Sequence, residues 1–175
     1  ATRGDGARRK VNPPLRGSAD RTALHRAFRE GRIPCLASDH APHSVAEKDR
    51  PFSRAPSGVP GVETMLPLFL DQVRRGELEL GTLMGATMER PARWLGQPMG
   101  RIAAGHRAHL IVVDFRDRRT IAARRLHAPC GWTPFEGWPA IFPRAHLLYG
   151  RTIVEDGEHI GGAIGRIRRP EFAPG

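Results

Sequence analysis

The stretch IPCLASDHAPH, residues 33–43, places an aspartate and two histidines directly after a short apolar run. Such a run, bounded by turn-forming residues, is typical of a short buried strand. Polar residues at the carboxyl end of a strand in an α/β protein often line its functional site. A carboxylate there, such as Asp39, can bind a metal ion and also carry a proton. Taken alone, the stretch favours an ordinary strand end with polar turn residues, and the segments around it reverse that balance.

A helix is predicted just before this strand. Ser18 is a favourable N-cap, the apolar residues 23, 24, 27 and 28 recur at helical spacing, and Gly31 is a typical helix stop. A helix followed by a strand is one repeat of an α/β barrel, which places Asp39 at the carboxyl end of a barrel strand. Residues 1–9 show no periodicity and are interpreted as a loop.

The pattern changes twice further along the chain. Residues 41–60 are rich in Pro and Gly and show no periodicity, which predicts a functional loop. Helical patterns follow at 62–76, 78–88 and 91–94. After residue 98 they give way to a β-branched strand at 110–114 and a hairpin at 145–154, which indicates a separate small β-domain.

Three segments in this order resemble the dihydroorotases, cyclic amidohydrolases of the amidohydrolase superfamily. They are KVNPPLR (10–16), SDHAPH (38–43) and APSGVPGVET (55–64). The resemblance continues through ERPARWLGQPMGRIAAGHRAHLIVVD (89–114) and TPFEGWPAIFPRAHLLYGRTIVEDG (133–157). It therefore covers the chain from about Lys10 to about Gly157.

The resemblance implies an α/β fold made of two parts. Residues 1–97 would form the C-terminal part of a TIM-type (β/α)₈ barrel of a metal-dependent hydrolase. Residues 98–165 would add strands of a small β-sandwich. Residues 166–175 lie beyond the resemblance and are interpreted as a basic tail from their own composition. A complete barrel needs about 250 residues, and this sequence has 175. The chain is therefore expected to be the C-terminal portion of a longer enzyme.

The implied reaction is the reversible, zinc-dependent interconversion of dihydroorotate and N-carbamoyl-aspartate in de novo pyrimidine biosynthesis. One or two Zn²⁺ ions are implied. Bound zinc lowers the pKa of water to about 7, which supplies a nucleophile. A catalytic zinc takes about three protein ligands besides water. Since the resemblance matches only one ligand here, most of them are expected outside this chain, and the chain alone is expected to be inactive.

Five residues match positions with functional roles in the family. Asp39 matches the aspartate that touches the metal and transfers the proton, so it is both catalytic and metal-binding. Asn12, His43, Ser57 and Gly58 match substrate-binding positions. The Asn12 amide can donate to and accept from an imide-like ring, although a capping role explains this residue nearly as well. Ser57 replaces a frequent aromatic, so a backbone contact is expected there, and Gly58 permits close backbone approach.

Other interpretations remain open. The chain could come from a neighbouring cyclic amidohydrolase, an allantoinase or hydantoinase, although His43 and the NPPLR wording favour dihydroorotase. It could also be a non-catalytic, dihydroorotase-like scaffold for aspartate carbamoyltransferase. A homo-oligomer is a further possible assembly. His40 matches no family role and is expected either to be structural or to support a neighbouring site residue.

Composition restricts the remaining classes. The net charge is +10, but the arginines are scattered and interleaved with acids, which does not favour a nucleic-acid interface. Cys35 and Cys130 lie far apart, so neither a zinc ribbon nor a disulfide framework is indicated. The sequence has no signal peptide and no apolar run of membrane-spanning length. A cytoplasmic protein that does not associate with membranes is expected.

Overall fold

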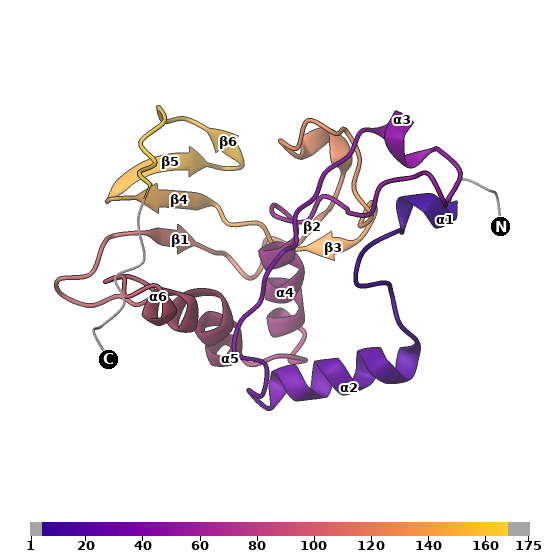
Figure 1. Ribbon diagram of the computed structural model, residues 1–175. Helices are drawn as coiled ribbons and strands as arrows, with labels where there is room; N and C mark the ends of the chain where they lie inside the picture. The colour runs from indigo at the N-terminus through magenta and orange to yellow at the C-terminus, as the bar shows by residue number, and fades with distance from the viewer. Residues whose placement is uncertain (1–4, 168–175) are drawn as a thin grey trace.

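The computed structural model describes residues 5–167 and has α/β structure (Figure 1). The helical elements are α1 (Asp5–Arg8), α2 (Ser18–Arg29), α3 (Val45–Lys48), α4 (Met65–Arg74), α5 (Leu80–Met84), the π-helical turn η1 (Gly85–Glu89), α6 (Arg90–Trp94) and the 3₁₀ turn η2 (Ala123–Arg125). The strands are β1 (Leu110–Val112), β2 (Arg119–Thr120), β3 (Pro139–Ala140), β4 (Ala145–Leu148), β5 (Arg151–Glu155) and β6 (Glu158–His159). The predicted basic tail lies, from residue 168 onward, outside the described residues.

Four of the strands form one antiparallel sheet in the order β1-β4-β5-β6, and β2 pairs with β3 in a separate ribbon. The predicted hairpin is confirmed as β4 and β5. Its turn is formed by Tyr149 and Gly150, whose φ angles are +52° and +75°. Two consecutive positive φ angles are what a tight turn between right-twisted strands requires. The strand predicted at 110–114 is also present, shortened to β1.

The helices after the predicted loop occur where the sequence places them. Helix α4 ends two residues before Gly76, whose φ of +71° stops it. The two helices predicted at 78–88 and 91–94 are instead joined into one rod through η1. Pro91 has no amide hydrogen to donate to the carbonyl of Thr87. The hydrogen-bond ladder therefore changes its period there, and the rod does not end.

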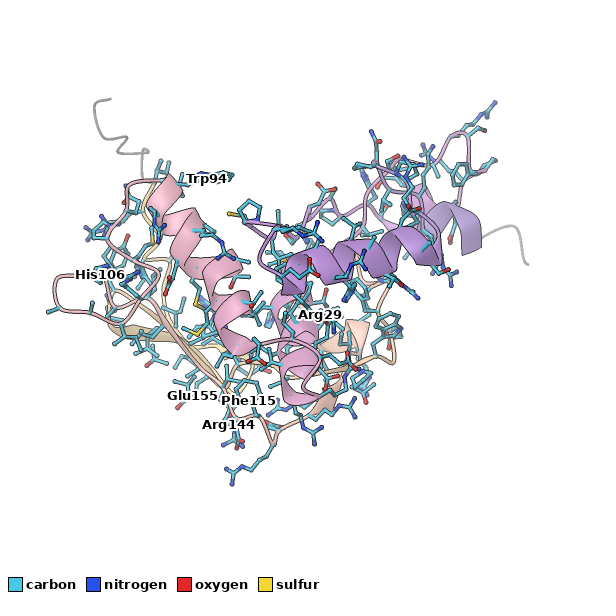
Figure 2. All side chains as sticks on the ribbon, turned by 90° about the horizontal axis from the view of Figure 1, so that it is seen from below. Arg29, Trp94, His106, Phe115, Arg144 and Glu155 are labelled. Carbon is cyan, nitrogen blue, oxygen red and sulfur yellow. The ribbon has the colours of Figure 1, made fainter. Side chains whose placement is uncertain are left out.

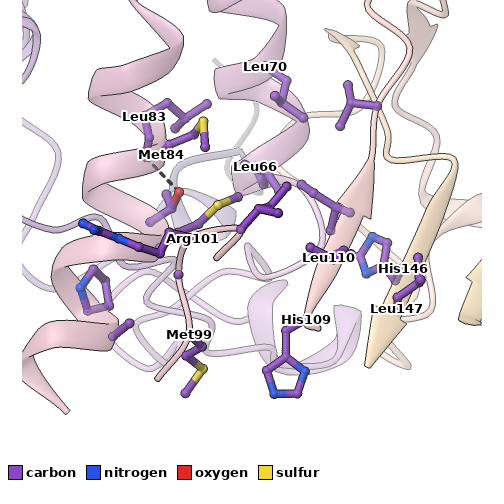
Figure 3. Close-up of a pocket in the computed structure, with 18 of the residues that line it drawn as sticks. Leu66, Leu70, Leu83, Met84, Met99, Arg101, His109, Leu110, His146 and Leu147 are labelled. Atoms are coloured by element: carbon purple, nitrogen blue, oxygen red, sulfur yellow. Dashed lines mark hydrogen bonds between the residues drawn. The ribbon is translucent and has the colours of Figure 1, made fainter. Parts of the chain in front are cut away.

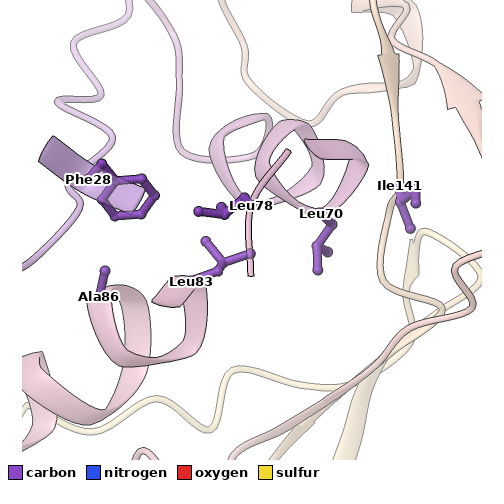
Figure 4. Packing of buried hydrophobic residues seen from close by; sticks show 6 residues of the cluster. All are labelled: Phe28, Leu70, Leu78, Leu83, Ala86 and Ile141. Atoms are coloured by element: carbon purple, nitrogen blue, oxygen red, sulfur yellow. The ribbon is translucent and has the colours of Figure 1, made fainter. Parts of the chain in front are cut away.

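The hydrophobic core joins the helices to the strand segment that follows β3. Its fully buried members are Phe28, Leu70, Leu78, Leu83, Ala86 and Ile141 (Figure 4). The rings of Phe28 and Phe69 meet edge to face at 5.6 Å, which links α2 to α4. The amide of Ile141 donates to the carbonyl of Pro67 at 3.1 Å. The C-terminal strands are thus packed directly on the helical part.

An apolar pocket of about 560 Å³ lies between the rod α5–α6 and the inner side of β1 and β4 (Figure 3). Leu66, Leu83, Met84, Leu110 and Leu147 are among its lining residues. None of the predicted site residues lines it. Trp94, at the outer end of α6, stays 68% exposed (Figure 2).

The strand predicted at residues 33–38 is not formed. This segment is extended, but no described residue pairs with it as a strand, and the amide of Leu36 donates to the carbonyl of Ala86 at 3.1 Å. A strand is defined by neighbours that share its hydrogen bonds. A single parallel bridge, between His40 and Val59, follows the segment.

Three smaller expectations were also wrong. Residues 5–8 of the predicted N-terminal loop form α1. Ser18 is the first residue of α2 and makes no capping bond, because Gly17 occupies the cap position. The predicted loop at 41–60 contains α3, which begins with a capping box between Ser44 and Glu47.

No helix within residues 5–167 is long and apolar enough to cross a bilayer.

One buried carboxylate connects α4 to the segment before β2. Asp71 is 2% exposed and accepts from Arg118 Nε at 2.7 Å and from Arg75 Nε at 3.0 Å. Burial would raise the pKa of Asp71, but the two guanidinium groups outweigh it and hold that pKa below its usual value. The pair therefore fixes the start of the C-terminal strands against α4.

We predict that this ion pair makes the fold sensitive to acid. Because the folded-state pKa of Asp71 is depressed, its stabilisation is present above the unfolded pKa of about 3.8 and is lost as pH falls through the folded value. Asp71→Asn should lower the free energy of unfolding at pH 7 and flatten its fall below pH 4, as measured by urea denaturation. Asp20→Asn on the exposed face of α2 is the control. Equal pH profiles for wild type and Asp71→Asn would contradict the assignment.

Candidate active site

The structure brings the SDHAPH motif (residues 38–43) next to the far end of the Pro/Gly-rich loop (residues 41–60). Ala41 donates its amide hydrogen to the carbonyl of Val59 at 3.1 Å. The Nδ1 atom of His40 accepts from the amides of Gly61 at 3.0 Å and Val62 at 3.2 Å. Since this nitrogen accepts, the proton of the neutral ring lies on Nε2. His40 thus anchors the loop, in agreement with its expected structural role.

Three of the predicted substrate-binding residues meet at this point. His43 donates from Nε2 to the carbonyl of Ser57 at 3.1 Å. Gly58 is buried and has a φ of +131°. A Cβ atom at Gly58 would lie 2.6 Å from Ala41 Cβ and 3.3 Å from His43 Nε2. Gly58 therefore lets the loop backbone pack closely against Ala41 and His43 of the SDHAPH motif.

A buried lysine fixes the loop from inside. Lys48 is 0% exposed, and its ammonium group donates to the carbonyls of Lys10 at 3.1 Å, Pro56 at 2.9 Å and Gly58 at 2.9 Å. All three of its hydrogens are therefore used. Burial, and to a lesser extent the charge of Lys10, lower the pKa of Lys48. We call this arrangement the lysine cage.

The N-terminal motif is tied to the same loop. Lys10 donates from Nζ to the carbonyls of Phe52 and Ala55, both at 2.8 Å, and accepts from the Gly58 amide at 2.9 Å. Both backbone polar groups of Gly58 are thus engaged by the protein. Asn12 follows two residues after Lys10 and is exposed. The structure therefore places the start of the NPPLR motif beside the loop that carries Ser57 and Gly58.

Asp39 stands at the turn between the extended segment and the loop. Its φ is +46°, a left-handed conformation that Asp adopts more readily than most residues. Its side chain is exposed, and no hydrogen bond or ion pair engages it within residues 5–167. The carboxylate is therefore available to a ligand or a substrate.

A segment from beyond residue 120 also reaches this region. The indole Nε1–H of Trp132 donates to the carbonyl of His43 at 2.7 Å. His127 donates from its backbone amide and from Nδ1 to the two oxygens of Glu63, each at 2.8 Å. The hydrogen bond and charge of Glu63 raise the pKa of His127. Trp132 and Glu63 thus join two parts of the chain that are far apart in sequence.

The described residues do not form a complete metal site. No group of three or more His, Cys, Asp or Glu side chains within residues 5–167 is arranged to hold an ion. Asp39 offers carboxylate oxygens that suit zinc, but one side chain falls short of the roughly three protein ligands that catalytic zinc takes. No catalytic step through a metal follows from these residues alone.

Sequence reasoning missed Lys48, Trp132 and Glu63. One signal was available for the first, since Lys10 and Lys48 are the only lysines in an arginine-rich chain and both bind carbonyls of the same loop. A compact ammonium group can serve three converging carbonyls, whereas a planar guanidinium cannot. For Trp132, no local pattern indicates a bond from its indole to His43.

We predict that Gly58→Ala disrupts the site by collision as well as by backbone strain. The added Cβ would meet Ala41 at 2.6 Å, so the free energy of unfolding should fall by about 3 kcal/mol. Gly105→Ala is the matched control, because Gly105 also has a positive φ, of +82°, but has nothing within 4 Å of the added atom. It should cost about 1 kcal/mol. Equal losses in urea denaturation would refute the close approach.

We predict that the contact between His127 and Glu63 weakens as pH rises. Because the folded-state pKa of His127 is raised above 6.5, its contribution is complete below the unfolded value and is lost as pH rises through the folded value. In an NMR titration, Glu63→Gln should lower the pKa of His127. Glu158→Gln is the control, since Glu158 is the weakest of the influences that raise this pKa. A His127 pKa unaffected by Glu63→Gln would disprove the pairing.

Known proteins resemble the chain in sequence and in structure. No protein-family model matches it. The dihydroorotase of Halobacterium salinarum is 46% identical over 158 residues, which is 90% of this chain and 37% of that protein. The dihydroorotase of Methanosarcina acetivorans is 46% identical over 147 residues, 82% of this chain and 32% of that protein. The chain thus spans about a third of the length of the curated relatives it matches.

Similar solved structures include hydantoinases and a dihydropyrimidinase. The D-hydantoinase (dihydropyrimidinase) from Thermus sp. superposes with a TM-score of 0.87 at 28% identity, over 94% of this chain and 38% of that one. The dihydropyrimidinase from Brevibacillus agri gives 0.85 at 28% identity, over 97% and 39%. The sequence and structural likenesses together identify the chain as a homologue, along most of its own length, of the dihydroorotases within the amidohydrolase superfamily.

Proposed function

We propose that this chain is the C-terminal portion of a zinc-dependent dihydroorotase. The complete enzyme would interconvert dihydroorotate and N-carbamoyl-aspartate in de novo pyrimidine biosynthesis. Residues 1–97 would complete a TIM-type barrel and residues 98–165 would supply strands of a β-sandwich. A cytoplasmic location remains a prediction, as do partnership with aspartate carbamoyltransferase and assembly into a homo-oligomer.

One observation carries the proposal. The three motifs that match dihydroorotase in sequence lie far apart in the chain, yet hydrogen bonds join them at one place. The lysine cage ties residue 10 to residues 56 and 58, and His43 contacts Ser57. Asp39 stands exposed two residues before the bond from Ala41 to Val59. The convergence of these motifs around an accessible carboxylate is what supports a shared site.

The chemistry assigns a separate task to each residue. In hydrolysis the water oxygen bonds to the ring carbonyl carbon, the bond from that carbon to the ring nitrogen breaks, and a proton passes to the nitrogen. Asp39 would accept the proton of the attacking water and deliver it to the leaving nitrogen, a contribution of about 10²–10⁴ in rate. Asn12 would hydrogen-bond the ring edge. His43 and Ser57 would hold the substrate from beside Asp39, and Gly58, whose amide already binds Lys10, would contact it through the second lone pair of its carbonyl.

The zinc proposal requires metal ligands from outside this chain. Asp39 would contribute one ligand to one or two ions, and segments of the relatives that have no counterpart in this chain would supply the others. We therefore expect no turnover from the 175-residue chain alone. Hydantoinase activity is the competing assignment, since similar solved structures include hydantoinases. The greater sequence identity to dihydroorotases favours dihydroorotate.

The test uses a joined protein, in which this chain follows the part of the Halobacterium salinarum dihydroorotase that precedes the matching region. With zinc it should convert dihydroorotate to N-carbamoyl-aspartate and leave hydantoin and allantoin largely unchanged. Asp39→Asn should lower kcat by about a thousandfold, because the amide cannot carry the proton. Metal content, measured by mass spectrometry, should also fall.

Asp156→Asn is the matched control, because Asp156 is also exposed and has a φ of +48°. Asn tolerates this left-handed conformation, so the control should keep full turnover. Activity of the 175-residue chain alone would refute its dependence on further segments. Full activity of Asp39→Asn in the joined protein would refute the catalytic role, and preferred turnover of hydantoin would favour the hydantoinase assignment.

A further inference from the structure

Residues 121–138, here called the clamp loop, form a closed loop beside the β2–β3 ribbon. Its base is fixed by two backbone bonds, from the Ile121 amide to the Trp138 carbonyl at 2.8 Å and from the Gly137 amide to the Ile121 carbonyl at 3.0 Å. Glu136 accepts from the amide of Ala123 at 2.7 Å, which braces its first turn. Because its base is closed, the loop can keep its conformation while its central residues pack against a neighbouring segment.

A central residue of the clamp loop, Trp132, contacts the candidate site. Trp132 is only 8% exposed, and its indole donates to the His43 carbonyl at 2.7 Å across 89 residues of sequence. The ring of Trp132 also lies 6.0 Å from the ammonium of Lys48, within the range of a cation–π contact. Figure 1 shows this orange segment beside the purple one that carries α3.

A second contact holds the other side of the site. The amide and Nδ1 of His127 both bind the carboxylate of Glu63, which follows directly after Val62. The amide of Val62 in turn donates to His40 at 3.2 Å. The clamp loop therefore contacts both parts of the candidate site. Trp132 binds His43 in the segment that also carries Asp39, and His127 binds Glu63, just after the Pro/Gly-rich loop.

We infer that the clamp loop holds the candidate site in its working geometry, with Trp132 as the positioning residue for His43. The bond to the His43 carbonyl fixes the backbone from which the imidazole reaches Ser57. Contact with Lys48 extends the effect to Pro56 and Gly58, whose carbonyls that lysine binds. Trp132 acts through these groups and does not touch the substrate. The kinetic consequence rests on the proposed function, whereas the structural consequence does not.

The first test measures amide hydrogen exchange by NMR in the full 175-residue chain. Trp132→Phe keeps a ring beside Lys48 but removes the donor to His43. Exchange should become about tenfold faster at the amides of Ala41 and Gly58 and stay unchanged in the β4–β5 hairpin. Trp138→Phe is the matched control, because Trp138 is 55% exposed and its ring packs against Phe135, with the ring centroids 5.6 Å apart. It should leave both regions unchanged.

The second test measures dihydroorotate turnover in the joined protein. A substrate held less well by a displaced His43 should show a KM raised by about tenfold and a kcat within about threefold of wild type. A general loss of folding would instead lower the amount of active enzyme and leave KM unaltered. Trp132→Leu, which also removes the ring beside Lys48, should raise KM further.

The two tests separate failure of the clamp from failure of the proposed function. Fast exchange at Ala41 and Gly58 in Trp132→Phe, without turnover of dihydroorotate by the wild-type joined protein, would support the clamp and refute the function. Exchange equal to that of Trp138→Phe would overturn the clamp. If the β4–β5 amides of Trp132→Phe also exchange faster, that variant is generally destabilised, and Glu63→Gln is measured in its place. Unchanged exchange at Ala41 in Glu63→Gln would then overturn the clamp.

Discussion

The ammonium group of Lys48 donates to three carbonyl oxygens that belong to residues 10, 56 and 58. These carbonyls come from an irregular loop and an N-terminal segment, neither of which could pair them in a helix or a sheet. Buried carbonyls without partners would cost about 1–3 kcal/mol each. One side chain thus provides what secondary structure provides elsewhere, and the arrangement of the candidate site follows from it.

Two different kinds of packing therefore share this small structure. Apolar contacts among α2, α4, the α5–α6 rod and Ile141 form the core. Around Asp39, in contrast, side-chain donors bind backbone carbonyls, and the bonds from Lys10 to Ala55, from Lys48 to Lys10 and from Trp132 to His43 span 45, 38 and 89 residues. Such bonds are directional and leave the loop little freedom. A site that must hold a small polar ring benefits from this rigidity because less ordering is needed when the substrate binds.

Several predictions succeeded because local sequence controls them. Gly76 ends α4 at a positive φ, and the β-branched run at residues 152–154 forms the centre of β5, which pairs with β4 across a tight turn. The strand at residues 33–38 failed for the opposite reason, since a strand requires neighbours that the described residues do not supply. The capping box at Ser44 and Glu47 is a local sequence signal for α3, but the Pro- and Gly-rich stretch around it predicts a loop.

The sequence by itself determined the order of the motifs, the helices after residue 62, the hairpin and the likeness to dihydroorotase, because each depends on residues close together in the chain. Only the tertiary structure decided that Lys48 binds three carbonyls, that Trp132 reaches His43 and that Glu63 pairs with His127. These contacts join residues that are separated along the chain and that meet only through tertiary packing. No local periodicity encodes such distances, so folding alone brings the donors and acceptors together.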